Sequence, residues 1–180
     1  NFDAVVQRVD HALSQTGLSI RFMNVGVSVP LWDRSHSAVQ ARIAETEALA
    51  KFMTHFGVKV AALQAGPVDA SRTFEASLMD CVQSLYDQYD IAEGHGVVFG
   101  LEPHYRSPIQ NLYHCRKLCD CMPRLQFVFD PSHLVMSGIP IQEYGWLLGH
   151  SVHVHLRDAT IDSFQMPFLS GEVDVHWVLN

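Results

Sequence analysis

The sequence predicts an α/β fold in which short strands of a parallel sheet alternate with amphipathic helices. Short apolar runs are separated by segments whose apolar residues recur at helical spacing. Polar residues stand at the ends of successive runs, namely Gln64, Glu102, Asp130 and His155. No glycine-rich phosphate loop follows any of the predicted strands. Because barrel enzymes carry their chemistry on the C-terminal rim of the strands, we favour a (β/α)8 TIM barrel over an open doubly wound sheet.

Length and composition indicate a single globular domain over residues 1–180. The chain is 48% hydrophobic and 17% charged, which supports a sizeable core. Its net charge of −7 disfavours a protein that grips nucleic acid by neutralising phosphates. No apolar stretch is long enough to span a bilayer, and no signal peptide is visible, although the chain opens on Asn1 rather than Met. The four cysteines form no CxxC pair and suit buried thiols, so we expect a cytoplasmic protein that binds neither nucleic acid nor a membrane.

The first half of the chain predicts two helices and two strands. Apolar spacing from Phe2 predicts a helix that is already running where the chain opens, although Asn1 could cap it, and that Gly17 ends. Ser37 is the expected cap of a second, long helix, which Gly57 closes. The expected elements after the first helix are a strand over 18–29, ended by Pro30, a helix over 38–56 and a strand over 58–63.

The second half continues the alternation of helix and strand. A short helical piece follows Asp130, and a loop is expected over 159–170. Five strands in all cannot close a barrel of eight, so we interpret the chain as an incomplete barrel. The other expected elements are helices over 73–93, 109–121 and 141–148, strands over 97–101, 125–129 and 152–156, and a first helical turn over 175–180.

The strand over 152–156 carries two histidines on one face. His153 and His155 alternate with apolar residues, and side chains two apart on a strand point to the same side. Two imidazoles on a covered face cost desolvation unless each has a partner, such as a metal ion, a carboxylate or a substrate. The eleven histidines of the chain also suit metal binding.

Three strand ends predict a metal site. Glu102, Asp130 and His155 end consecutive strands, and neighbouring parallel strands lie about 4.8 Å apart, so inward side chains at one level can converge on one ion. Two carboxylates and a neutral imidazole suit Mn²⁺, Co²⁺, Mg²⁺ or Zn²⁺. Two alternatives stay open: Glu102 as a strand-end cap or ion-pair partner, and Asp130 as the cap of a helix with Pro131 in its first turn.

Four short motifs lie at or just after predicted strand ends. They are Leu101-Glu102-Pro103-His104, Phe129-Asp130-Pro131-Ser132-His133, His153-Val154-His155-Leu156-Arg157-Asp158 and Gly171-Glu172-Val173-Asp174. In this order and spacing they resemble the xylose isomerase-like TIM barrels, above all the sugar phosphate isomerase/epimerase branch. The resemblance implies that the chain runs from the third barrel strand to just past the seventh, with the first two strands and the last one missing.

The resemblance also implies roles for individual residues. It gives Glu102, Asp130 and His155 as metal ligands, with a fourth ligand, a Glu on the eighth strand, beyond Asn180. His133 matches a substrate-contacting His and, with Glu102, is an expected catalytic residue. The remaining expectations are that Arg157, His104 and Trp32 bind substrate, Trp32 as a pocket wall unless it only covers the barrel, that Asp158 contacts a ligand or the substrate, and that His153 supports His155.

The implied activity is divalent-metal-dependent isomerisation or epimerisation of a small sugar, sugar phosphate or polyol ketone. A metal that holds a carbonyl and a neighbouring hydroxyl oxygen stabilises the enediolate formed when a C–H proton is removed. In the epimerase branch the metal-bound glutamates move that proton, so Glu102 would act with the absent eighth-strand Glu. We expect a small-molecule sugar as the partner, and a homo-oligomer is an option.

Two rival functions stay in view. A phosphodiesterase acting on abasic DNA, of the endonuclease IV type, would by resemblance need further rim histidines. Gln64 stands where one of them is wanted, and the net charge is unfavourable for DNA. The other rival is an inactive truncated barrel with unpaired edge strands. Asp174-Val175-His176 mimics a metal-binding pair, but it lies where the family starts a helix, so we discount it.

Overall fold

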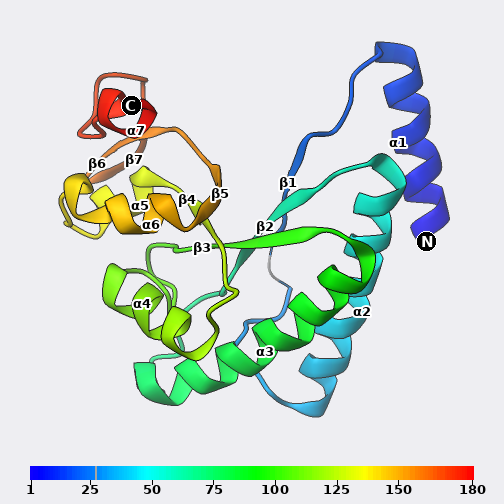
Figure 1. Cartoon of the computed structure of the whole chain (residues 1–180), viewed down its shortest axis with the longest axis horizontal. Helices are drawn as coiled ribbons and strands as arrows, with labels where there is room; N and C mark the ends of the chain where they lie inside the picture. Colours follow the sequence, from blue (N-terminus) through cyan, green and yellow to red (C-terminus); the bar gives the residue numbers. More distant parts are fainter. Residues whose placement is uncertain (27) are drawn as a thin grey trace.

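The computed structural model describes residues 1–26 and 28–180 and shows a half-barrel of five parallel strands, an α/β fold of the TIM-barrel kind (Figure 1). The strand order in the sheet, β1-β2-β3-β4-β5, is also the order in the chain. The elements are α1 (Phe2–Thr16), β1 (Phe22–Asn24), α2 (His36–Phe56), β2 (Val60–Gln64), α3 (Phe74–His95), β3 (Val98–Glu102), α4 (Leu112–Cys121), β4 (Phe127–Phe129), α5 (Pro131–Met136), the 3-10 helix η1 (Ile141–Tyr144), α6 (Gly145–Gly149), β5 (Ser151–Val154), β6 (Asp158–Thr160), β7 (Ser163–Met166) and α7 (Val175–Leu179).

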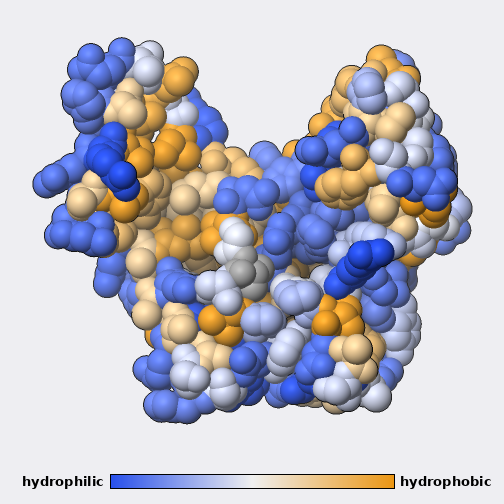
Figure 2. Space-filling view, turned by 180° about the vertical axis from the view of Figure 1, so that it is seen from behind, coloured by the Kyte–Doolittle hydropathy of each residue, from blue (hydrophilic) through white to orange (hydrophobic). Residues whose placement is uncertain are grey.

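The core lies between the sheet and the helices that cover its outer side. α2 and α3 contact each other beneath β2 and β3 (Figure 1). Met53 of α2 and Leu85 of α3 are fully buried there with Phe99 of β3, because each helix turns one apolar stripe to the sheet. In contrast, α1 buries none of its residues and projects from one end of the molecule, which leaves the surface hollowed between it and the C-terminal elements (Figure 2).

The strands align so that their C-terminal ends meet. Gln64 pairs in register with Glu102, and Phe129 pairs with Val154. Gly100 permits this alignment in the middle of β3, since a Cβ there would lie 2.8 Å from Val128 Cγ2. The side chains at the ends of β2, β3, β4 and β5 therefore share one edge of the half-barrel.

Several predicted boundaries differ in the structure. α2 begins at His36 rather than Ala38, because the Ser35 side chain, not Ser37, accepts the hydrogen bond of the capped N–H. Asn1 does cap α1. The strand predicted over 18–29 keeps only the three residues of β1, and Val27 of that prediction lies outside the described residues. α4 begins at Leu112, after the Asn111 cap, rather than at Ile109.

The main correction is that the predicted loop over 159–170 contains most of an antiparallel hairpin, formed by β6 and β7. Its two strands are only three and four residues long, and Gln165 takes a positive φ of 67°, which is uncommon for a residue other than glycine. The helix predicted over 141–148 is divided between η1 and α6. Within residues 1–26 and 28–180, no helix is both long and apolar enough to cross a membrane.

Candidate functional site

The edge formed by the strand ends brings together the three residues that the sequence predicts as metal ligands. Glu102 ends β3, Asp130 follows β4, and His155 follows β5. One potential ligand atom from each lies within 4.8 Å of the others. Glu102 and Asp130 are 1% and 2% exposed, and His155 is partly open to solvent. Two carboxylates and an imidazole nitrogen form a donor set that fits a divalent ion.

Glu102 is held as an anion by two neighbouring side chains. Its Oε1 lies 2.7 Å from Nδ1 of His155, and its Oε2 accepts a hydrogen bond of 3.0 Å from the Gln64 amide. Burial opposes ionisation of this carboxyl. The hydrogen bonds from His155 and Gln64 outweigh burial and lower the pKa of Glu102 to about 2.

The two oxygens of Asp130 accept hydrogen bonds from different neighbours. Oδ1 accepts hydrogen bonds from the Ser132 backbone N–H (2.9 Å) and hydroxyl (2.5 Å), so Asp130 is also the N-cap of α5. Oδ2 accepts a hydrogen bond of 2.8 Å from Nε of Arg157 and lies 3.9 Å from Nδ1 of His155. Burial raises the pKa of Asp130, and the bonds from Arg157 and Ser132 act against that rise.

His133, predicted to be catalytic, lies beside both carboxylates. Its Nε2 is 3.9 Å from Oε1 of Glu102 and 3.8 Å from Oδ2 of Asp130, and its Nδ1 accepts a bond of 3.3 Å from the Tyr105 N–H. Burial, with the neighbouring His104 second, lowers the pKa of His133 to about 3. The imidazole is therefore neutral and can exchange hydrogen bonds without carrying charge.

The structure places the other predicted residues unequally. The His104 ring packs 3.8 Å from the His133 ring, centroid to centroid, and Arg157 lies at the cluster. His153 stacks on Phe22 of β1 at 3.6 Å, beside His155. Trp32 is not brought to the cluster: its indole N–H donates to the Pro67 carbonyl at 2.8 Å, at the foot of the β2–α3 loop.

Asp158, expected to contact a ligand or the substrate, holds a loop instead. Its oxygens accept hydrogen bonds from the backbone N–H groups of Gly171 (2.7 Å), Val173 (3.1 Å) and Ala159 (2.9 Å). Burial opposes ionisation, but these bonds together lower the pKa of Asp158. The carboxylate is thus occupied in fastening the segment that follows the β6–β7 hairpin.

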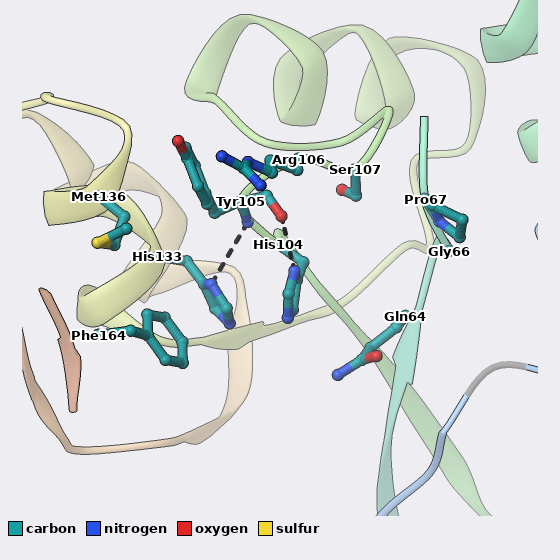
Figure 3. Close-up of a pocket in the computed structure, with 10 residues that line it drawn as sticks. All are labelled: Gln64, Gly66, Pro67, His104, Tyr105, Arg106, Ser107, His133, Met136 and Phe164. Carbon is teal, nitrogen blue, oxygen red and sulfur yellow. Dashed lines mark hydrogen bonds between the residues drawn. The ribbon is translucent and has the colours of Figure 1, made fainter. Parts of the chain in front are cut away.

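Two neighbouring cavities open at the strand ends. A cleft of about 440 Å³ is lined by the candidate ligands Glu102 and His155 together with Arg157. A second cavity of about 500 Å³ lies beside it (Figure 3). Gln64, His104 and Phe164 line both, so the two cavities are contiguous.

Sequence reasoning missed several residues that line this region, among them Tyr105, Met136 and Phe164. Phe164 belongs to the unpredicted hairpin, and its ring lies 4.1 Å from the Arg157 guanidinium and 4.8 Å from the His133 ring. Tyr105 directly follows the strand-end motif with His104, so its proximity to the motif was the available signal. Nothing in the local pattern distinguishes Met136 from a core residue.

The chain belongs to the xylose isomerase-like TIM barrel family, whose pattern it matches over residues 2–180. This confirms the resemblance inferred from the four strand-end motifs. No curated protein matches the sequence.

Solved structures share the fold at low sequence identity. The E. coli 3-keto-D-glucoside 4-epimerase YcjR is 20% identical, with a TM-score of 0.79 over 99% of this chain and 72% of its own. The IolI protein with a bound zinc atom is 18% identical, with a TM-score of 0.74 over 98% of this chain and 66% of its own. An AP endonuclease of family 2 from Brucella melitensis is 13% identical, with a TM-score of 0.76 over 99% of this chain and 71% of its own.

Proposed function

We propose that this chain carries the metal site of a divalent-metal-dependent sugar isomerase or epimerase. The observation that carries the proposal is the convergence of Glu102, Asp130 and His155 within 4.8 Å at the edge of a solvent-accessible cleft. Family membership supports the enzyme class, and the neighbours named as an epimerase and as a zinc-bound protein agree with it. We also propose that β1 to β5 correspond to strands three to seven of the family's barrel. Because all four cysteines are free thiols, we propose a reducing compartment, the cytoplasm.

In the proposed reaction a proton moves between carbons of a substrate that contains a carbonyl and a neighbouring hydroxyl. A divalent ion held by the three ligands would supply positive charge that stabilises negative charge on the substrate oxygens. Glu102 takes the carbon-bound proton and returns it. A carboxylate with a pKa near 2 is a weak base, so the transfer depends on a substrate C–H that its carbonyl has made acidic. Neutral His133, with Arg157 and His104, orients the substrate oxygens.

Metal titration of the purified chain tests the site. We expect the wild type to bind one divalent ion per chain by calorimetry, and Asp130→Ala to bind none. Asp120→Ala is the matched control, because that carboxylate is 71% exposed on α4, where it pairs with Lys117 and not with the candidate ligands. A wild-type chain that binds no divalent ion, or an Asp130→Ala variant that binds as the wild type does, overturns the proposed site.

Hydrogen exchange tests the reaction itself. A ketose is incubated with the metal-loaded chain in D₂O, and NMR follows the C–H next to the carbonyl. We expect loss of that signal with the wild type and retention with Glu102→Gln, because the amide cannot take the proton. Metal binding without exchange for any ketose, aldose or polyol ketone would favour the inactive truncated barrel.

The second candidate is cleavage of abasic DNA, favoured by the Brucella neighbour named as an AP endonuclease. Two features argue against it in this chain. Gln64 at the end of β2 donates to Glu102 and offers no imidazole, and the net charge of −7 repels a polyanion. Metal-dependent cleavage of a duplex with one abasic site, without C–H exchange on sugars, would reverse the ranking.

A further inference from the structure

Arg157 brings a positive charge directly against one of the three candidate metal ligands. Its Nε donates to Oδ2 of Asp130 at 2.8 Å, and its Nη2 lies 2.6 Å from the same oxygen. The other oxygen of Asp130 accepts the Ser132 N–H and hydroxyl. Oδ2 is also the oxygen that lies 3.9 Å from Nδ1 of His155. An ion shared with Glu102 and His155 would therefore take the oxygen that Arg157 already holds.

A guanidinium and a divalent ion cannot share this oxygen without strong repulsion. Both are cations, and the carboxylates of Asp130 and Glu102 are buried, where like charges repel each other more than they do in water. An ion bound at Oδ2 must either displace the guanidinium or bind against its charge. In both cases the charge of Arg157 lowers the affinity of the site for the ion.

The contact of Arg157 with His133 does not fix the guanidinium in place. Nη2 of Arg157 lies 2.9 Å from Nε2 of His133, while the Tyr105 N–H points at Nδ1 of the same ring at 3.3 Å. A neutral imidazole offers only one acceptor nitrogen, so it cannot accept from both donors. With Nδ1 accepting from Tyr105, Nε2 carries the hydrogen and faces the N–H groups of Arg157. Asp130 is then the partner that holds the guanidinium.

The cleft at the strand ends offers a second place for this guanidinium. The Arg157 side chain is partly open to solvent and lines the cleft of about 440 Å³ together with Glu102 and His155. The Phe164 ring, 4.1 Å from the guanidinium, lines the same cleft. A cation is attracted to an aromatic face within about 6 Å of the ring centroid, so Phe164 can keep the guanidinium in the cleft after it leaves Asp130.

We propose that Arg157 competes with a divalent ion for Oδ2 of Asp130 and is released into the cleft when an ion takes that oxygen. Arg157 is then a positioning residue with two states, one that neutralises Asp130 and one that faces the cleft. The proposal rests on the proposed function, because it takes Glu102, Asp130 and His155 as the metal site. It adds an order of binding: the guanidinium is free for a substrate oxygen only after the metal is bound.

Calorimetric titration of three variants with Zn²⁺ tests the competition. Arg157→Gln keeps a polar side chain without the charge, so we expect it to bind Zn²⁺ at least tenfold more tightly than the wild type. Arg157→Lys keeps the charge and should stay within threefold of the wild type. Arg34→Gln is the matched control, because Arg34 pairs at 2.8 Å with Asp87, a carboxylate outside the candidate ligand set, and should leave the affinity unchanged.

The Arg157 side chain of the wild type gives a second measurement that needs no variant. Its Nε–H group donates to Asp130, and this hydrogen bond slows exchange of the Nε hydrogen with water, which proton–nitrogen NMR detects. We expect one equivalent of Zn²⁺ per chain to shift the Nε–H signal and to speed its exchange. An Nε–H signal that is unchanged at saturating Zn²⁺ overturns the release of Arg157, even if Arg157→Gln does not fold.

The outcomes separate the role of Arg157 from the proposed function. Zn²⁺ binding by the wild type, with equal or weaker binding by an Arg157→Gln protein of native circular dichroism, overturns the competition and leaves the metal site standing. Arg157→Lys that binds Zn²⁺ as tightly as Arg157→Gln also overturns it, because the charge would then have no effect. No Zn²⁺ binding by the wild type or by any of the variants overturns the proposed function and this inference together.

Discussion

Asp130 and Asp158 are two buried carboxylates of the same rim with different partners. Both are at most 2% exposed, both stand after a strand of the parallel sheet, and both accept backbone N–H groups. One oxygen of Asp130 accepts hydrogen bonds from Ser132, and the other lies next to Arg157 and His155. Both oxygens of Asp158 accept hydrogen bonds from backbone N–H groups of the segment that ends in Val173.

The two carboxylates differ in how many of their oxygen lone pairs accept hydrogen bonds from the backbone. A carboxylate with one oxygen among the side chains of a candidate ligand set can bind a cation, whereas one saturated by backbone donors is fixed as an anion inside the structure. The pKa shifts agree: burial raises the pKa of Asp130, while for Asp158 the backbone bonds overcome burial and lower the pKa. Position at a strand end is therefore not enough to identify a ligand.

The largest expected effect comes from Asp130→Asn, which changes the carboxylate that lies beside Glu102 and His155 in the candidate metal site. We expect its affinity for a divalent ion to fall more than a hundredfold. Substitutions of residues that only hydrogen-bond to a metal ligand already weaken metal binding about 10–100-fold, and this substitution removes the charge of the ligand itself. Calorimetry with the metal alone measures the effect. The isosteric Asp158→Asn should bind within threefold of the wild type. Equal losses in the two variants would erase the distinction drawn between the two carboxylates.

Asp158→Asn should act on stability instead. The amide keeps one acceptor and places an NH₂ group against a backbone N–H, so we expect the free energy of unfolding to fall by about 2 kcal/mol. Urea denaturation of the metal-free protein gives this value. Limited proteolysis should cut first between residues 161 and 173, the segment that Asp158 holds. A variant as stable as the wild type would show that this carboxylate does not stabilise the segment between residues 161 and 173.

The sequence was sufficient for the half-barrel and for the meeting of Glu102, Asp130 and His155. Alternating periodicity marked the five parallel strands, and Gly17 and Gly57, both at positive φ, marked two helix ends. The β6–β7 hairpin was missed because its strands are only three and four residues long and β7 is largely exposed. The backbone contacts of Asp158 were not foreseen, because its partners lie 13 and 15 residues downstream and follow that hairpin. The contact of Phe164 with Arg157 depends on the same tertiary step.

Gly171→Ala tests the Asp158 region from its other side. A Cβ at Gly171 would collide with the Asp158 carboxylate and lie 2.5 Å from the Ala159 carbonyl oxygen. We expect a loss of about 1.5 kcal/mol in the free energy of unfolding, because neither group is the free end of a flexible side chain. Gly94→Ala is the control: it meets nothing within 4 Å in α3 and should stabilise the protein slightly. If the two variants are equally stable, the close approach at Gly171 is not a constraint.

Ser132→Ala tests how Asp130 is oriented. The Ser132 hydroxyl is fully buried and donates to Oδ1 of Asp130, so its loss should weaken metal binding about tenfold by freeing the carboxylate to rotate. Asp69 and Ser71 form the same arrangement on the surface, with the Ser71 N–H and hydroxyl both donating to Oδ1 of Asp69. Ser71→Ala should therefore leave the metal affinity unchanged. An unchanged affinity in Ser132→Ala would mean that the buried position alone orients Asp130.

The smallest expected effect is a pH dependence confined to the Asp158 region. The pKa of Asp158 is lowered from 3.8 in the folded state, so its ionised form stabilises the fold above about pH 4. This stabilisation is lost as pH falls through the lower folded pKa, because the unfolded chain takes up the proton first. The difference in free energy of unfolding between the wild type and Asp158→Asn should therefore shrink between pH 6 and pH 3, which urea denaturation of both proteins at each pH measures. Because all other groups titrate alike in the two proteins, a constant difference would mean that the carboxylate is not stabilised by its charge.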